Sequence, residues 1–78
     1  MQDDFMDRFS ILIVSKQGIN RLYCPFKVVV IRSNPLTIIG EYYLVDEISY
    51  GYYPIIYFKV KKENIPSIYF KIIFEEEV

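Results

Sequence analysis

Few residues of this chain could take part in catalysis, and histidine is not among them. Histidine is the most common general base and metal ligand, so the five serines lack the usual partner that activates a hydroxyl nucleophile. Asp46 and Glu47 are neighbours on a predicted strand, which points their carboxylates to opposite faces and keeps them from acting as an acid–base pair. We therefore expect that this chain is not an enzyme.

Binding sites for phosphate, metals or cofactors are not expected either. The three glycines lie far apart and each falls in a predicted turn, so they form no glycine-rich phosphate loop. Cys24 is the single cysteine, and we interpret it as a small buried apolar residue in a reducing compartment rather than a reactive thiol. Carboxylates near both ends could gather a cation if the ends met, but a solvated charge run is the simpler interpretation. These carboxylates are Asp3, Asp4, Asp7, Glu75, Glu76 and Glu77.

Composition limits the class of protein. A chain of 78 residues makes one domain, 1–78, with a small core. Hydrophobic residues make up 53% of it, above the roughly 45–50% usual for soluble domains, so some apolar side chains must face outward or a neighbour. A net charge of −1 disfavours a dedicated nucleic-acid binder. The acidic start and the lack of an apolar run near ~18 residues predict a cytoplasmic protein without a membrane span.

Alternation of apolar and polar residues predicts strands along most of the chain. Residues 1–7 precede the first strand as a flexible arm or one helical turn. The first strand covers residues 9–14, and Gly18 supplies the turn after it because glycine adopts positive φ readily. We expect its core-facing side chains to be those of Phe9, Ile11 and Ile13, with Leu12 and Val14 on the opposite face.

Two prolines mark interruptions in the next part of the chain. Pro25 cannot donate to a strand ladder, so it separates residues 22–24 from a second strand over residues 26–31. Ser33-Asn34-Pro35 predicts a turn, because Ser and Asn favour turn starts and Pro presets φ at the second turn position. Residues 36–39 are then either a short extended arm or a loop leading to Gly40.

The segment from Leu36 to Val60 is predicted to be one β-hairpin with its turn at Gly51. Lysines mark the solvent side of its second strand and of the last strand, which covers residues 68–74. The residues expected to point inward are Tyr43, Val45, Glu47, Ile56, Phe58, Val60, Ile68, Phe70, Ile72 and Phe74. Those expected to point outward are Tyr42, Leu44, Asp46, Tyr53, Ile55, Tyr57, Lys59, Tyr69, Lys71 and Ile73. Short turns between about five antiparallel strands favour a small barrel, which leaves few exposed edges.

One stretch of the chain carries a family resemblance. A Val-rich strand is followed by Leu36-Thr37, Gly40, Tyr43 and Val45, then by a tyrosine-rich hairpin and a terminal aromatic strand. In this order, over residues 27–76, the chain resembles the small SH3-like barrel proteins of bacteria and phages. The resemblance implies an all-β SH3-like barrel and no catalytic residue. The chain departs from the family in its extra N-terminal strand and in having Glu41 where a basic residue often follows the glycine.

The surplus of outward apolar residues suggests a function. Tyrosines crowd the predicted hairpin, where they could cap a small barrel, form a protein-binding face or stack on nucleic-acid bases. Burying one large aliphatic side chain is worth roughly 1.5–3 kcal/mol, so leaving a set of them in water forfeits much of the stability of a small domain. A second copy of the chain or a target protein would cover them. The outward apolar set is Leu12, Val14, Leu44, Ile55, Tyr57 and Ile73.

We therefore predict a non-enzymatic protein-binding module that self-associates, in the setting of an inhibitor or accessory factor encoded by a phage or another mobile element. No cofactor is expected. The alternative is a small nucleic-acid-binding barrel that uses Lys59, Lys61 and Lys62 with exposed tyrosines. The predicted contact residues are Tyr42, Leu44, Tyr53, Ile55, Tyr57, Tyr69 and Ile73, with Lys59 and Lys71 at the rim.

Overall fold

A computed structural model describes residues 7–16, 18–52 and 55–73 of the chain. This part is all-β, as predicted, with one short 3₁₀ turn, η2 (Ser67–Tyr69), and no helix that could cross a membrane. It has more strands than the sequence suggests, because extended segments are interrupted near Pro25, at Asp46 and at η2. The strands are β1 (Ser10–Ser15), β2 (Gly18–Tyr23), β3 (Phe26–Val30), β4 (Tyr42–Val45), β5 (Glu47–Tyr50), β6 (Ile56–Val60), β7 (Glu63–Pro66) and β8 (Phe70–Ile73).

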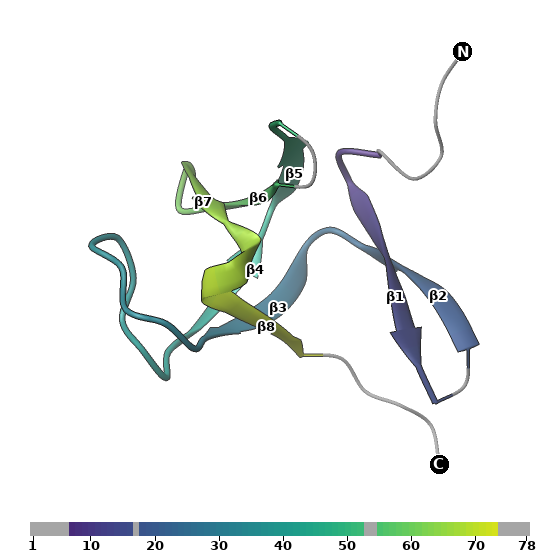
Figure 1. The fold of residues 1–78 in the computed structure, drawn as a ribbon, viewed down its shortest axis with the longest axis horizontal. Helices are drawn as coiled ribbons and strands as arrows, with labels where there is room; N and C mark the ends of the chain where they lie inside the picture. Colours follow the sequence, from purple (N-terminus) through teal and green to yellow (C-terminus); the bar gives the residue numbers. More distant parts are fainter. Residues whose placement is uncertain (1–6, 17, 53–54, 74–78) are drawn as a thin grey trace.

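The strands form three small antiparallel sheets, in the orders β1-β2, β4-β3-β8 and β5-β6-β7 (Figure 1). The described strands are therefore arranged as open sheets and not as the closed barrel that the sequence predicts. The middle sheet joins distant parts of the chain, since β3 pairs with both β4 and β8. The predicted hairpin from Leu36 to Val60 is therefore only half correct. Its β5 and β6 pair across the turn at Gly51, with Tyr50 opposite Ile56, but β4 pairs with β3 instead.

The direction of the side chains changes at Asp46, between β4 and β5. Val45 and Ile48 are three residues apart and both fully buried, which strict alternation does not allow. Asp46 N donates to the carbonyl of Lys59 at 3.0 Å, so the chain stays attached to β6 while it turns from one sheet to the next. Glu47, predicted to share a face with Val45, instead lies half-buried, pairs with Arg8 and has the Lys59 ammonium 3.7 Å away.

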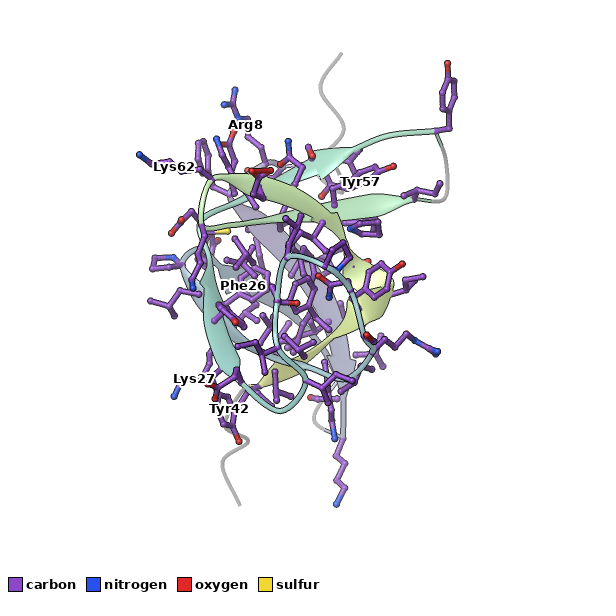
Figure 2. The ribbon with its side chains drawn as sticks, turned by 90° about the vertical axis from the view of Figure 1, so that its left-hand side faces the viewer. Arg8, Phe26, Lys27, Tyr42, Tyr57 and Lys62 are labelled. Atoms are coloured by element: carbon purple, nitrogen blue, oxygen red, sulfur yellow. The ribbon has the colours of Figure 1, made fainter. Side chains whose placement is uncertain are left out.

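The core lies between the inner faces of the two three-stranded sheets. The ring of Phe26, labelled among the inner side chains in Figure 2, meets the ring of Phe58 edge to face. Their centroids are 5.4 Å apart, and the centroid of Phe70 lies 6.0 Å from that of Phe58. The predicted inward positions of β4, β6 and β8 are thus largely confirmed. The buried hydrophobic residues are Phe26, Val28, Val30, Val45, Ile48, Phe58, Val60, Ile65 and Phe70.

Face assignments from the sequence are also wrong at η2 and at the start of the first strand. Ile68 is 64% exposed and Tyr69 packs against the core, because η2 interrupts the alternation that was counted through residues 68–74. At the first strand, Phe9 is exposed whereas Ser10 is fully buried, since the Ser10 hydroxyl accepts a hydrogen bond from Arg21 Nη1 at 2.7 Å. Phe74 lies outside the described residues.

The hairpin formed by β1 and β2 stands at the side of the other sheets (Figure 1). Its base packs on the core through Ile11 and Leu22, whereas Val14 near its tip is 81% exposed. The predicted turn between these strands is confirmed, and Gly18 has a φ of 113°.

A two-residue turn, Lys61-Lys62, connects β6 and β7, with Val60 opposite Glu63. Both lysines have positive φ, 52° and 69°. Turns of this length and conformation favour Asn and Gly, because a Cβ makes the left-handed region costly. The turn is therefore a place where the sequence does not match the local backbone.

Replacing Lys62 by Gly should raise the free energy of unfolding by about 0.5–1 kcal/mol, because glycine adopts this φ without strain. Urea denaturation followed by tyrosine fluorescence measures the change. The matched control is Lys62→Ala, which removes the same charge and keeps the Cβ, and which should give no stabilisation. Equal stabilisation by both variants would contradict this explanation and indicate an effect of charge.

Candidate protein-binding surfaces

The β4-β3-β8 sheet turns one face away from the core, and strand register places its residues in two rows. One row runs Leu44-Lys27-Ile73 and the other runs Tyr42-Val29-Lys71. We call these six residues the outer sheet face. Tyr42 and Leu44 are 61% and 55% exposed, both lysines are exposed, and Val29 and Ile73 are half-buried. A regular sheet therefore presents a mostly apolar surface to solvent.

Lys27 lies at the centre of this face, with Leu44 on one side and Ile73 on the other. Its ammonium is 5.7 Å from the ring centroid of Tyr42, within the range of a cation–π contact (Figure 2). The ion pairs of the described residues involve neither Lys27 nor Lys71. The outer sheet face is thus mostly apolar and carries two positive charges that have no carboxylate partner among residues 7–16, 18–52 and 55–73.

The predicted contact residues do not form one surface. The outer sheet face unites Tyr42, Leu44, Lys71 and Ile73. Tyr53 lies outside the described residues. The remaining members belong to other elements of the fold.

Ile55, Tyr57 and Lys59 belong to the sheet β5-β6-β7 and the turn that leads into it. The Tyr57 ring packs so closely on Gly51 that a Cβ there would lie 2.7 Å from it. Lys59 lies 3.7 Å from Glu47, and Tyr69 packs against the core rather than facing a partner. Alternation predicts that these residues face outward, but Tyr57, Lys59 and Tyr69 each make contacts within the chain.

A second apolar surface lies in the connection between β3 and β4. The segment 33–40, which we call the apolar loop, contains no charged residue. Three of its aliphatic side chains face solvent, with Leu36, Ile38 and Ile39 exposed by 51%, 65% and 58%. The sequence predicts only an extended arm or a loop here, and no binding surface. The signal that could have revealed it is the run of eight uncharged residues with three large aliphatics next to a turn motif.

Hydrogen bonds hold the backbone of the apolar loop in place. Asn34 Oδ1 accepts from the backbone N–H groups of Leu36 and Thr37, both at 3.0 Å, and Asn34 Nδ2 donates to Thr37 Oγ1 at 2.6 Å. This arrangement confirms the turn predicted at Asn34-Pro35. Gly40, with a φ of 87°, donates its N–H to the carbonyl of Val30 at 2.9 Å. The aliphatic side chains are therefore carried by an ordered backbone.

The start of the connection is fixed to the η2 turn. Ile31 N donates to the Tyr69 carbonyl at 2.9 Å, and Arg32 Nε donates to the Ile68 carbonyl at 3.1 Å. Ile31 and Ile68 are themselves 49% and 64% exposed. Two further exposed aliphatic residues thus lie where the connection meets η2.

The lysines considered for nucleic-acid binding are partly engaged within the chain. Lys59 is close to Glu47, and the Lys61 ammonium lies 5.0 Å from the ring centroid of Tyr43. Lys62 is exposed in the turn beside them. These contacts occupy two of the three lysines and disfavour the nucleic-acid alternative.

Comparison of the chain with protein-family models, curated proteins and solved structures finds no match. Among the described residues, no group of three His, Cys, Asp or Glu side chains is placed to hold a metal ion.

Cys24 lies half-buried where β2 leads into β3, and it packs against the core. Burial raises the pKa of its thiol, and the negative charges of Asp46, Asp7 and Glu47 raise this pKa further. A raised pKa leaves little thiolate at neutral pH, and the thiolate is the nucleophile. The structure therefore supports a structural role for this cysteine, although it is less buried than the sequence suggests.

Iodoacetamide should alkylate native Cys24 more slowly than the same cysteine in the urea-unfolded chain at about pH 8, because the raised pKa and the packing both reduce its reactivity. Mass spectrometry follows the reaction. Asp46→Asn removes a nearby negative charge, so the pKa should fall and the rate should rise. Glu63→Gln removes a charge that does not act on Cys24 and should leave the rate unchanged. Equal rates in native and unfolded protein would show that this account is wrong.

Proposed function

We propose that this chain is a non-enzymatic protein-binding module that associates with a second copy of itself through the apolar loop. The observation that carries the proposal is an uncharged segment with three exposed aliphatic residues on an ordered backbone. An ordered loop loses little conformational entropy when it binds, so more of the gain from burial remains as affinity. The inhibitor or accessory factor of a phage or mobile element stays the proposed biological setting.

The energy available indicates a weak dimer. Leu36, Ile38 and Ile39 are each about half exposed, so burying the rest of each is worth about 1 kcal/mol, or about 6 kcal/mol over two protomers. Association costs about 4–15 kcal/mol in lost freedom of motion. Ile31 and Ile68 must therefore add to the contact, and the assembly should depend on concentration.

Charge favours the apolar loop over the outer sheet face as the surface for self-association. In a two-fold symmetric contact the same patch of each copy meets, so residues near the axis face their own counterparts. The apolar loop tolerates this because it carries no charge. The outer sheet face would bring Lys27 close to the Lys27 of the second copy, which is repulsive. We therefore place the self-association at the apolar loop and not at Tyr42 and Leu44, where the sequence predicts it.

For the fold of β3 to β8 we infer an SH3-like arrangement. Three observations support it: the first of these strands pairs with the last, β4 and β5 form one nearly continuous segment that serves both sheets, and a 3₁₀ turn leads into the final strand. The resemblance in residues 27–76 agrees with the same inference. The β1-β2 hairpin is an addition to this arrangement.

Light scattering after size-exclusion chromatography tests the proposed function. Between about 10 and 500 µM, the mass of the wild-type chain should rise from 9.4 kDa toward twice this value. The double variant Ile38→Ser/Ile39→Ser should stay monomeric, because it removes apolar area at the centre of the contact. Leu44→Ser makes the same chemical change on the outer sheet face and should dimerise like the wild type.

Two results would reject the proposal. One is a wild-type mass that stays at the monomer value over the whole concentration range. The other is a loop variant that dimerises normally while Leu44→Ser does not, because this would place the contact on the sheet.

A further inference from the structure

We propose that the outer sheet face binds an acidic, apolar segment of another protein. This surface is made by β3, β4 and β8 and is separate from the apolar loop, so the inference goes beyond the self-association proposed above. It rests on the position and the charge state of Lys27 and Lys71.

The first step concerns Lys27, which lies between Leu44 and Ile73. A partner that covers both apolar neighbours must also cover the lysine. Removing an ammonium from water without a partner is costly, whereas an ion pair with further hydrogen bonds recovers much of that cost. A purely apolar partner is therefore disfavoured, and the partner must bring a carboxylate to the centre of the face.

The second step concerns charge within the chain. Neither row of the outer sheet face contains an acidic residue, and the ion pairs of the described residues leave both of its lysines out. Neither lysine therefore has an ion-pair partner in the described part of the chain, and both can pair with a negative partner.

The third step concerns spacing. Lys27 and Lys71 are diagonal neighbours, since Lys27 is opposite Ile73 and Lys71 is opposite Val29. Diagonal positions on adjacent strands are about 7–8 Å apart, and alternate residues of an extended chain are separated by about 6.6–6.8 Å. An extended segment with two acidic residues two positions apart can therefore reach both lysines, while apolar residues beside them contact Tyr42 and Leu44.

A protein partner fits this surface better than nucleic acid. Nucleic-acid affinity comes largely from many phosphate contacts, and this face offers two lysines among six residues in a chain with a net charge of −1. Its majority of apolar side chains is typical of the central part of a protein interface.

Selection from a random dodecapeptide library displayed on phage tests the inference with the full chain as bait. The wild type should enrich peptides with Asp or Glu two positions apart beside aromatic or aliphatic residues. Lys27→Gln should lose this enrichment. Lys62→Gln also removes one positive charge, but from the turn between β6 and β7, which lies far from Lys27 in the view of Figure 2. This control variant should keep the enrichment.

Fluorescence anisotropy with one selected peptide, synthesised and labelled, then gives the affinity. Lys27→Gln should raise Kd by at least about fivefold, whereas Lys27→Arg and Lys62→Gln should leave it near the wild-type value. The Lys27→Arg variant separates loss of charge from loss of folding. The Ile38→Ser/Ile39→Ser loop variant should bind the peptide normally, so failure of the self-association proposal does not affect this result.

Several outcomes would overturn the inference. These are the absence of selected binders, selection without an acidic bias, and equal weakening by Lys27→Gln and Lys62→Gln. Loss of peptide binding in the loop variant would place the peptide on the other surface. Tighter, Lys27-dependent binding of a single-stranded oligothymidine would assign the face to nucleic acid.

Discussion

The reversal of side-chain direction at Asp46 is the constraint on which the described core depends. One extended segment supplies β4 to one sheet and β5 to the next, and each sheet needs an apolar residue inside. Val45 and Ile48 meet this need only because an additional residue lies between them. Strict alternation would bury the charge of Glu47 and expose Ile48. The bond from Asp46 N to Lys59 O shows that the backbone remains paired through the change.

Alternation read from the sequence succeeds where a strand runs without interruption. Lys59 lies between Phe58 and Val60 in sequence, so alternation predicts that both of these apolar side chains point inward, and both are buried. The turns at Gly18 and Asn34 are predicted from the known preferences of these residues. Counting fails after an inserted residue or a short helical turn, since each changes the face of everything beyond it. The exposed Ile68 results from η2, whose three residues carry no strong sequence signal.

The candidate surfaces were harder to predict than the strands, for a different reason. Facing outward is a local property of a residue, but sharing a surface depends on which strands pair. Pairing of β3 with β4 and β8 brings Tyr42, Leu44 and Ile73 around Lys27, a residue that is not among the predicted contact residues. The same pairing leaves Tyr57 on another sheet. Charge distinguishes the two exposed surfaces, since the apolar loop is neutral and the outer sheet face is positive.

The β1-β2 hairpin is hydrogen-bonded to the rest of the chain at its base and exposed to solvent at its tip. Its base is held by the bonds from Ile48 N to Arg8 O and from Cys24 N to Phe9 O, while Val14 and Ile19 near the tip are 81% and 69% exposed. A two-stranded sheet is marginally stable by itself, so local opening should begin at the tip. Amide hydrogens there should exchange with solvent sooner than those at the base, and the hairpin can fray while the aromatic centre around Phe58 stays intact.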